Sequence, residues 1–220
     1  MNAERTRFAL FLSVCSVVSS GCSPSAGRGT FTPNNPSPPD LDYPVGSFSL
    51  TERDGRTVTE KDLAGKVWVA SFVFTRCPGN CPAVTATVRR LQSELTDGPV
   101  MFVTFTVDPK RDNPDELRKY ADRYQADPKR WLFLTGDRAT IRKLLQERFK
   151  QSAGDDPTAD TKAGEEFATH STRLVVVDKN GVIRGMYDGM PKPDFPDADA
   201  RFEDGLKRLK EKVKQLAAEN

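Results

Sequence analysis

Histidine is nearly absent from this chain, which has one among its 220 residues, His170, and only four cysteines. Each of these five side chains is therefore a candidate for chemistry. An excess of one charge sign is also missing, because 33 basic and 31 acidic residues are interleaved to a net charge of +2. Proteins that bind nucleic acid usually carry a clustered basic face. The composition thus gives no indication of a nucleic-acid partner.

The N-terminal apolar run, residues 8–18, is well short of the roughly 20 residues that a membrane-spanning helix needs. Arg5 and Arg7 precede this run, and the small residues 19–21 follow it. A charged start, a short apolar stretch and a small-residue cleavage site are typical of a secretory signal peptide. We therefore expect residues 1–21 to direct export and to be removed.

The segment that ends this signal, Ser19-Ser20-Gly21-Cys22, resembles a bacterial lipobox, with serine at its first position where an aliphatic residue is usual. The resemblance implies that Cys22 becomes the lipidated N-terminus of a membrane-tethered lipoprotein facing the periplasm or the cell exterior. Residues 22–44 contain six prolines and no apolar period, which indicates an extended linker. A single folded domain is expected over residues 45–220.

Strand and helix patterns alternate through this domain. Residues 66–74 and 100–107 are continuous apolar, β-branched and aromatic runs, as expected of strands buried on both faces. Helix and strand patterns that alternate in this way predict an α/β fold with a mixed, mostly parallel sheet flanked by helices. The remaining predictions are strands at 47–51, 131–134, 174–177 and 182–187, the last two joined as a C-terminal β-hairpin by a turn at 178–181, and helices at 82–95, 112–124, 139–149 and 200–218.

The segment T-R-C-P-G-N-C-P, residues 75–82, places Cys77 and Cys81 where a buried strand leads into a helix. The N-terminus of a helix favours a thiolate, and Arg76 adds a nearby positive charge. The pair could be a structural disulfide, a redox pair or two metal ligands. A disulfide across so short a loop would stabilise the fold only weakly. We therefore expect a reactive dithiol.

Two soft thiolates favour Cu(I) or zinc, but two do not fill a tetrahedral zinc site and the chain has no second Cys-x-x-Cys pair. An imidazole from His170 would suit copper as a third ligand. A lone histidine is more often an ordinary surface residue than a ligand. His170, however, ends a long polar loop, residues 150–169, directly before a predicted strand. Movement of such a loop could bring its imidazole over the dithiol.

Three segments in order resemble the Sco/SenC family: F-V-F-T-R-C-P-G-N-C-P at 72–82, T-V-D-P-K-R-D-N-P at 106–114, and H-S-T at 170–172 with D-K-N-G at 178–181. The resemblance implies a thioredoxin-like fold and copper bound by Cys77, Cys81 and His170. It also implies copper delivery to, or thiol reduction at, the CuA subunit of cytochrome c oxidase, with a separate copper or thiol donor. Asp108 would then lie next to the site and assist docking or tune the thiols.

Two functions remain open at this point. The first is a metallochaperone that carries copper to the oxidase. The second is an enzyme activity, thiol-disulfide exchange or peroxide sensing, that uses Cys77 and Cys81 without copper. His170 distinguishes them, because disulfide exchange does not need an imidazole whereas a three-ligand copper site does. A module that only binds partners would leave both cysteines without a role.

Overall fold

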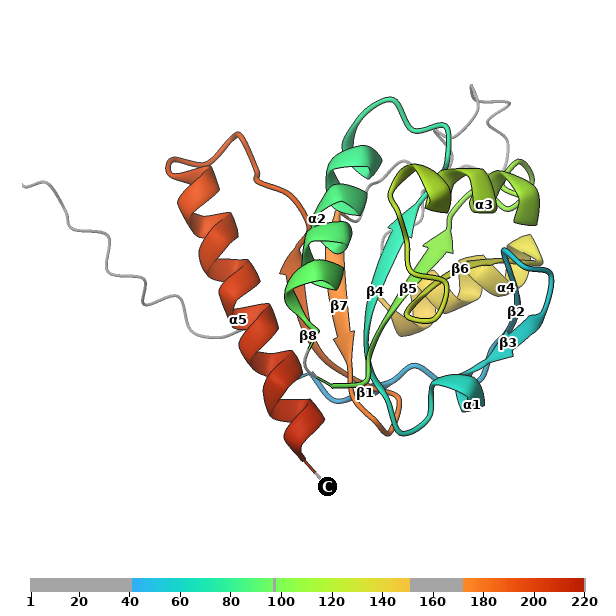
Figure 1. The fold of residues 1–220 in the computed structure, drawn as a ribbon, viewed down its shortest axis with the longest axis horizontal. Coiled ribbons are helices and arrows are strands. Elements are labelled where there is room, and N and C mark those ends of the chain that lie inside the picture. The colour runs from blue at the N-terminus through green and yellow to red at the C-terminus, as the bar shows by residue number, and fades with distance from the viewer. Residues whose placement is uncertain (1–40, 97, 151–171, 220) are drawn as a thin grey trace, which may run out of the picture. The chain divides into compact units, whose positions relative to one another are not determined.

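The structure, a computed structural model, describes residues 41–96, 98–150 and 172–219. These residues form one mixed sheet of eight strands in the order β1-β8-β7-β4-β5-β6-β2-β3 (Figure 1). The strands are β1 (Tyr43–Pro44), β2 (Ser49–Glu52), β3 (Thr57–Thr59), β4 (Val67–Val73), β5 (Val100–Thr106), β6 (Trp131–Thr135), β7 (Arg173–Val177) and β8 (Val182–Asp188). The helices are α1 (Glu60–Leu63), α2 (Asn80–Glu94), α3 (Pro114–Arg123), α4 (Arg138–Lys143), the π-helical turn η1 (Leu144–Arg148) and α5 (Ala198–Ala218).

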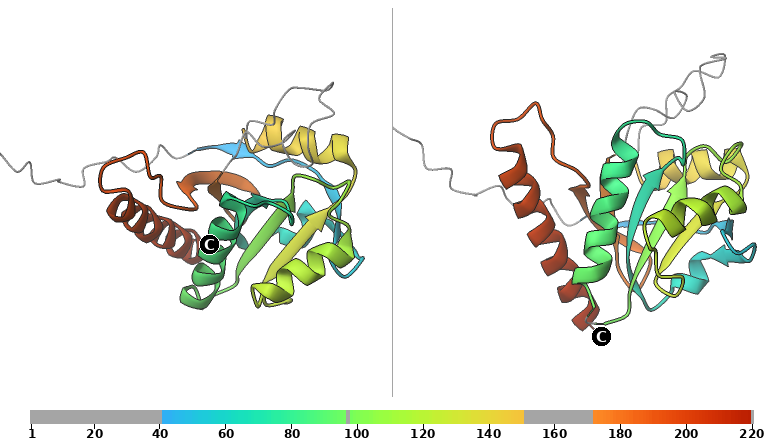
Figure 2. Two further views of the ribbon diagram at one scale, coloured as in Figure 1. Left: turned by 90° about the horizontal axis from the view of Figure 1, so that it is seen from above. Right: turned by 45° about the horizontal axis from the view of Figure 1, so that its top comes forward.

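Helices cover the sheet on both faces. Figure 2 shows α2, α3 and α5 on one face and α4 on the other. Alternate residues of β4 and β5 point into two separate apolar clusters, one under α2, α3 and α5 and the other under α4 and η1. This arrangement explains why all seven residues of β4 are buried, and it confirms the predicted α/β class and its helix-flanked sheet.

The parallel part of the sheet is smaller than the sequence predicts. Among the described strands, only β4, β5 and β6 pair in parallel, and the other pairings are antiparallel. The predicted hairpin is present as β7 and β8, joined by the short turn at 178–181. A connection that short can only join antiparallel neighbours, and the same holds for β2 and β3. The mixed sheet is therefore parallel in its centre and antiparallel at its margins.

Several boundaries differ from the predicted ones. The helix predicted at 139–149 is α4 followed by η1, and β3 and α1 have no counterpart in the prediction. Tyr43 and Pro44, predicted within the linker, pair with β8 at the edge of the sheet. The helix predicted at 112–124 is α3, in which the side chain of the capping residue Asn113 accepts a 3.0 Å hydrogen bond from the backbone N–H of Glu116 and Pro114 is the first helical residue.

In the part of the chain that the structure describes, no helix combines the length and low polarity needed to cross a bilayer.

Candidate metal and redox site

The dithiol lies between the end of β4 and the start of α2. Cys77 is half-buried in the connecting segment, and Cys81 is buried in the first turn of the helix, with both thiols free. The backbone N–H of Cys81 donates a 3.4 Å hydrogen bond to the Sγ of Cys77. The first N–H groups of a helix have no partner within the helix and carry partial positive charge. The sulfur of Cys77 therefore lies where a thiolate is stabilised.

The two thiols differ in their surroundings. Burial raises the pKa of the Cys81 thiol well above its usual range, and the side-chain contact with Cys77 raises this pKa further, although the backbone of Phe74 opposes the shift. This direction is opposite to the lowering expected from a helix N-terminus, because burial in apolar surroundings outweighs the dipole. Arg76 is exposed, and its charge acts on Glu116 in α3. The site thus pairs a more accessible sulfur with one that retains its proton.

A buried carboxylate that the sequence analysis did not identify, Asp112, anchors the segment before Cys77. Its Oδ2 accepts a 3.0 Å hydrogen bond from the backbone N–H of Thr75, and its Oδ1 accepts one of 2.6 Å from the Thr75 hydroxyl. The Thr106 hydroxyl, at the end of β5, donates to Oδ2 at 2.6 Å. Asp112 belongs to the same T-V-D-P-K-R-D-N-P segment as Asp108 and lies four residues after it. Its membership in that segment was the sequence signal that could have identified it.

Asp108, the predicted neighbour of the site, uses its carboxylate in an ion pair with Arg111, at 3.0 Å. Its backbone N–H donates to the Thr106 hydroxyl, and its carbonyl accepts from the N–H of Asp112. Asp108 thus helps to shape the turn that presents Asp112. Its predicted effect on docking or on the thiols stays a prediction.

The start of β7 lies beside the C-terminal end of β4, where the dithiol follows, because β7 runs antiparallel to β4. The N–H of Gly189, just after β8, donates a 2.6 Å hydrogen bond to the carbonyl of Thr172. A Cβ on Gly189 would lie 3.2 Å from Val84 of α2 and 2.6 Å from that carbonyl, so only glycine allows this approach. The chain at Thr172 is therefore close to the helix that carries Cys81.

Two predicted site residues, His170 and the predicted lipidation site Cys22, lie outside the described residues. Within the described ranges, no group of three or more histidine, cysteine, aspartate or glutamate side chains could hold a metal ion. The described part of the site is thus the dithiol, with Asp112 behind the segment that carries Cys77.

Comparison with known proteins identifies relatives for most of the chain. The SCO1/SenC family model matches residues 38–199. A SCO1 protein homolog of Bacillus subtilis strain 168 is 31% identical over 160 residues, which cover 71% of this chain and 80% of the relative. A putative copper-binding protein of Stutzerimonas stutzeri is 28% identical over 144 residues, covering 64% of this chain and 67% of the relative.

Solved structures give the same result. A SCO1/SenC family lipoprotein from Bacillus anthracis is 30% identical with a TM-score of 0.66, over 81% of this chain and 97% of the other. BsSco, a cytochrome c oxidase assembly protein described with a disulfide switch, is 28% identical with a TM-score of 0.64, over 82% and 97%. ScoI of Bradyrhizobium japonicum with copper bound is 27% identical with a TM-score of 0.52, over 76% and 99%.

Proposed function

The chain belongs to the SCO1/SenC family, and from this premise we propose that it binds copper and serves in the assembly of cytochrome c oxidase. The observation that carries the proposal is the pair of free thiols at the N-terminus of α2, joined by the Cys81 N–H to Cys77 Sγ contact. Relatives described as copper-binding, or solved with copper bound, support the choice of metal. The acceptor would be the CuA subunit of the oxidase.

Cys77, Cys81 and His170 are the proposed copper ligands. Two thiolates supply the soft donors that favour Cu(I), and an imidazole is also a good donor to copper. Metal binding releases the thiol protons, so copper has to displace the proton that burial holds on Cys81. His170 precedes Thr172 by two residues, and two residues of extended chain span at most about 7 Å. That short reach from a point close to α2 supports His170 as the third donor.

In this function copper is cargo, and the protein has to hold it and then release it. The partial exposure of Cys77 gives a partner access to one ligand, while Cys81 is shielded from water. An acceptor with its own thiolates could thus take the metal first from Cys77 and then from Cys81. The N–H of Cys81 would stabilise the charge on the Cys77 sulfur at each stage.

The difference between the two thiols also favours a second candidate function, thiol-disulfide exchange. Attack on a partner disulfide needs an accessible thiolate, and release of the mixed disulfide needs a second thiol nearby. Cys77 and Cys81 have these positions, and the disulfide switch described for BsSco supports this candidate. The protein could then reduce the CuA cysteines before copper arrives.

Copper stoichiometry and affinity, measured on the reduced domain and its variants, test the two functions. Cys77→Ser and Cys81→Ser should lose both copper and disulfide exchange. His170→Ala should keep a dithiol that titrates with a thiol reagent but bind copper much more weakly, because one donor is missing. Equal copper affinity in His170→Ala and the parent would exclude the three-ligand site and leave disulfide exchange as the better-supported function.

The proposed location is the outer face of a membrane, with Cys22 lipidated and the proline-rich linker before β1 as a tether. A single acyl chain gives only marginal membrane binding, whereas two or more anchor a protein stably. Mass spectrometry of the membrane-extracted protein should therefore find an acylated Cys22 at the mature N-terminus. An intact Met1, or a mature protein that starts elsewhere without lipid, would contradict the tether.

A further inference from the structure

We propose that Asp112 is a positioning residue for Cys77, whose carboxylate fixes the segment between β4 and α2 so that the two sulfurs stay together. This inference deepens the proposed function, on which it rests for its relevance to copper. The position of Cys77 relative to Cys81 governs both functions considered above. A residue that sets this position acts on the site without touching metal or partner.

The contacts of Asp112 tie the cysteine segment to the sheet. Both hydrogen bonds from Thr75 come from the residue two positions before Cys77, at 3.0 and 2.6 Å. The bond from Thr106, at 2.6 Å, comes from the end of β5, a buried strand of the sheet centre. One carboxylate therefore joins a rigid strand to the segment that carries the accessible thiol.

The segment itself has few other restraints. Pro78, Gly79 and Asn80, the first residue of α2, are exposed, and they separate Cys77 from the buried Cys81. The N–H of Cys77 donates to the carbonyl of Phe74 at 3.2 Å, which closes a tight turn around Thr75. Thr75 lies inside that turn, and Cys77 is the last residue of the turn. The hydrogen bonds from the Thr75 N–H and hydroxyl to Asp112 therefore fix the orientation of Cys77.

The burial of Asp112 also indicates a specific role. The residue is 1% exposed, and its described hydrogen bonds come from neutral donors. Burying a carboxylate is costly unless hydrogen bonds compensate it. The compensation here comes mainly from Thr75, so the cost of burial and the placement of the cysteine segment are linked. Loss of the carboxylate should free the segment in the reduced protein, and closing a disulfide would then have to order it again.

Equilibration with glutathione tests the proposal without any metal. Glutathione disulfide takes two electrons and the two thiol protons of Cys77 and Cys81, which form one S–S bond, and leaves as two glutathione molecules. Asp112→Ala should lower the equilibrium constant for this step about tenfold, the factor that 1.4 kcal/mol produces. A hydrogen bond to a charged group is worth at least that much.

Three variants separate positioning from charge and from stability. In Asp112→Asn the amide oxygen can accept from the Thr75 N–H and the Thr106 hydroxyl while the amide nitrogen donates to the Thr75 hydroxyl. This variant should restore the parent constant without the charge. Thr104→Val is the matched control, since it removes a buried hydroxyl of the same strand, β5, that is hydrogen-bonded to Ser71 at 2.8 Å rather than to Asp112. Thr75→Val removes a bond on the cysteine side and should give an intermediate constant.

The outcomes are distinct. An equilibrium constant that falls in Asp112→Ala, recovers in Asp112→Asn and is unchanged in Thr104→Val supports the proposal. An unchanged constant in Asp112→Ala, or an equal fall in Asp112→Asn, overturns it. If Asp112→Ala does not fold, the comparison of Thr75→Val with Thr104→Val decides in the same way.

A copper titration of the same variants then connects this result to the proposed function. Loss of a residue that orients a metal ligand typically costs about 10- to 100-fold in metal affinity, which is the fall expected in Asp112→Ala. If the parent protein binds no copper but the glutathione constants follow the pattern above, the copper function fails and the positioning role of Asp112 stands.

Discussion

Glu52 and Asp112 both have buried carboxylates, but the two carboxylates have different hydrogen-bond and ion-pair partners. Burial raises the pKa of each. Glu52, at the end of β2, has the guanidinium of Arg53 beside it, with Nε at 3.6 Å. Asp112 accepts from the neutral groups of Thr75 and Thr106 and has the like charge of Asp108 nearby. One carboxylate is neutralised within the scaffold, and the other is held by the segment that carries a thiol.

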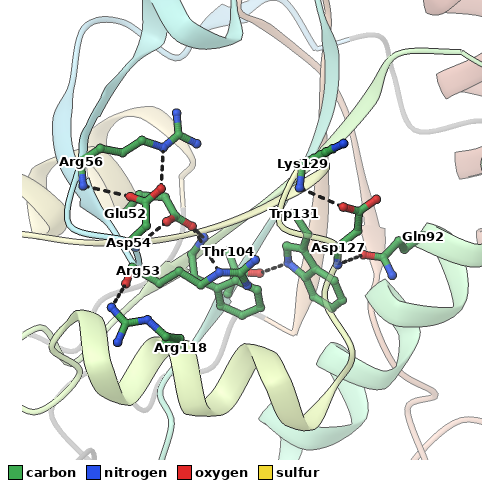
Figure 3. A network of polar contacts seen from close by, with 11 residues as sticks. Glu52, Arg53, Asp54, Arg56, Gln92, Thr104, Arg118, Asp127, Lys129 and Trp131 are labelled. Carbon is green, nitrogen blue, oxygen red and sulfur yellow. Dashed lines mark hydrogen bonds and ion pairs between the residues drawn. The ribbon is translucent and has the colours of Figure 1, made fainter.

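Glu52 belongs to a network of hydrogen bonds and ion pairs between elements of the scaffold, shown in Figure 3. Its Oε1 accepts from the N–H of Phe133 at 3.2 Å, and its Oε2 accepts from the N–H of Asp54 at 2.7 Å. Arg53 stacks on the ring of Phe133, and Arg118 of α3 donates to the carbonyl of Arg53 at 2.9 Å. These contacts join β2, β6 and α3. The comparison indicates that burial of a charge marks a functional position only where a functional segment supplies the partners.

The largest expected effect on stability is that of Glu52→Ala. Removing one partner of a buried ion pair typically costs about 3–5 kcal/mol of unfolding free energy, because the other charge is left uncompensated. Arg53 would be that charge, since its side chain is 9% exposed. Chemical denaturation measures the loss. The glutathione equilibrium of the dithiol should not change, and a change there would remove the distinction between the two carboxylates.

Asp112→Ala should have a smaller effect on stability and a larger one on the thiols. A buried donor left without an acceptor costs about 1–3 kcal/mol, and this applies to the buried Thr106, whereas Thr75 is partly exposed and its groups can bond to water. Denaturation curves, recorded beside the glutathione constants, give both quantities for one protein sample. A variant that loses stability as Glu52→Ala does, with its thiols unaffected, would place Asp112 in the scaffold as well.

The pH dependence of stability sharpens the comparison further. A carboxyl with a raised pKa in the folded state holds more protons there than in the unfolded chain, so its contribution to stability is lost as pH rises through the folded pKa. The window starts at about pH 4, where unfolded carboxyls titrate. Relative to Glu52→Gln and Asp112→Asn, the parent should therefore lose stability between pH 4 and the raised values.

This expected loss of stability with rising pH is tested by measuring the unfolding free energies of the parent and both amide variants from pH 4 to pH 8, at intervals of about one pH unit. Stability of the parent that rises with pH relative to both variants would mean that hydrogen bonds outweigh burial at these positions, contrary to the raised pKa values.

The smallest effect is expected at an exposed carboxylate, Glu203 of α5, which pairs with Arg90 of α2 at 2.6 Å. This contact lowers the pKa of Glu203, but both side chains are largely exposed, and Arg90 also pairs with Glu94. Glu203→Ala should cost less than about 1 kcal/mol, and less still in high salt. A loss as large as that of Glu52→Ala would show that the packing of α5 on α2 depends on this pair.

Much of the fold follows from local patterns. The long apolar runs of β4 and β5, the helix α3 and the turn at 178–181 each depend on residues within a few positions of one another, and each is where the sequence predicts it. The dithiol at a strand–helix junction is likewise a local feature. Short strands such as β3 escaped prediction because three residues carry too little periodicity.

The sequence by itself determined which side chains can do chemistry here: a pair of thiols with a fixed spacing at the start of a helix, in a chain with one histidine. Only the tertiary structure decided how those thiols differ. The burial of Cys81, the raised pKa of its thiol and the anchoring of Thr75 by Asp112 arise where β4, α2 and the end of β5 meet. Burial and hydrogen bonds between residues more than 30 positions apart depend on the packing of whole elements, which no local pattern encodes.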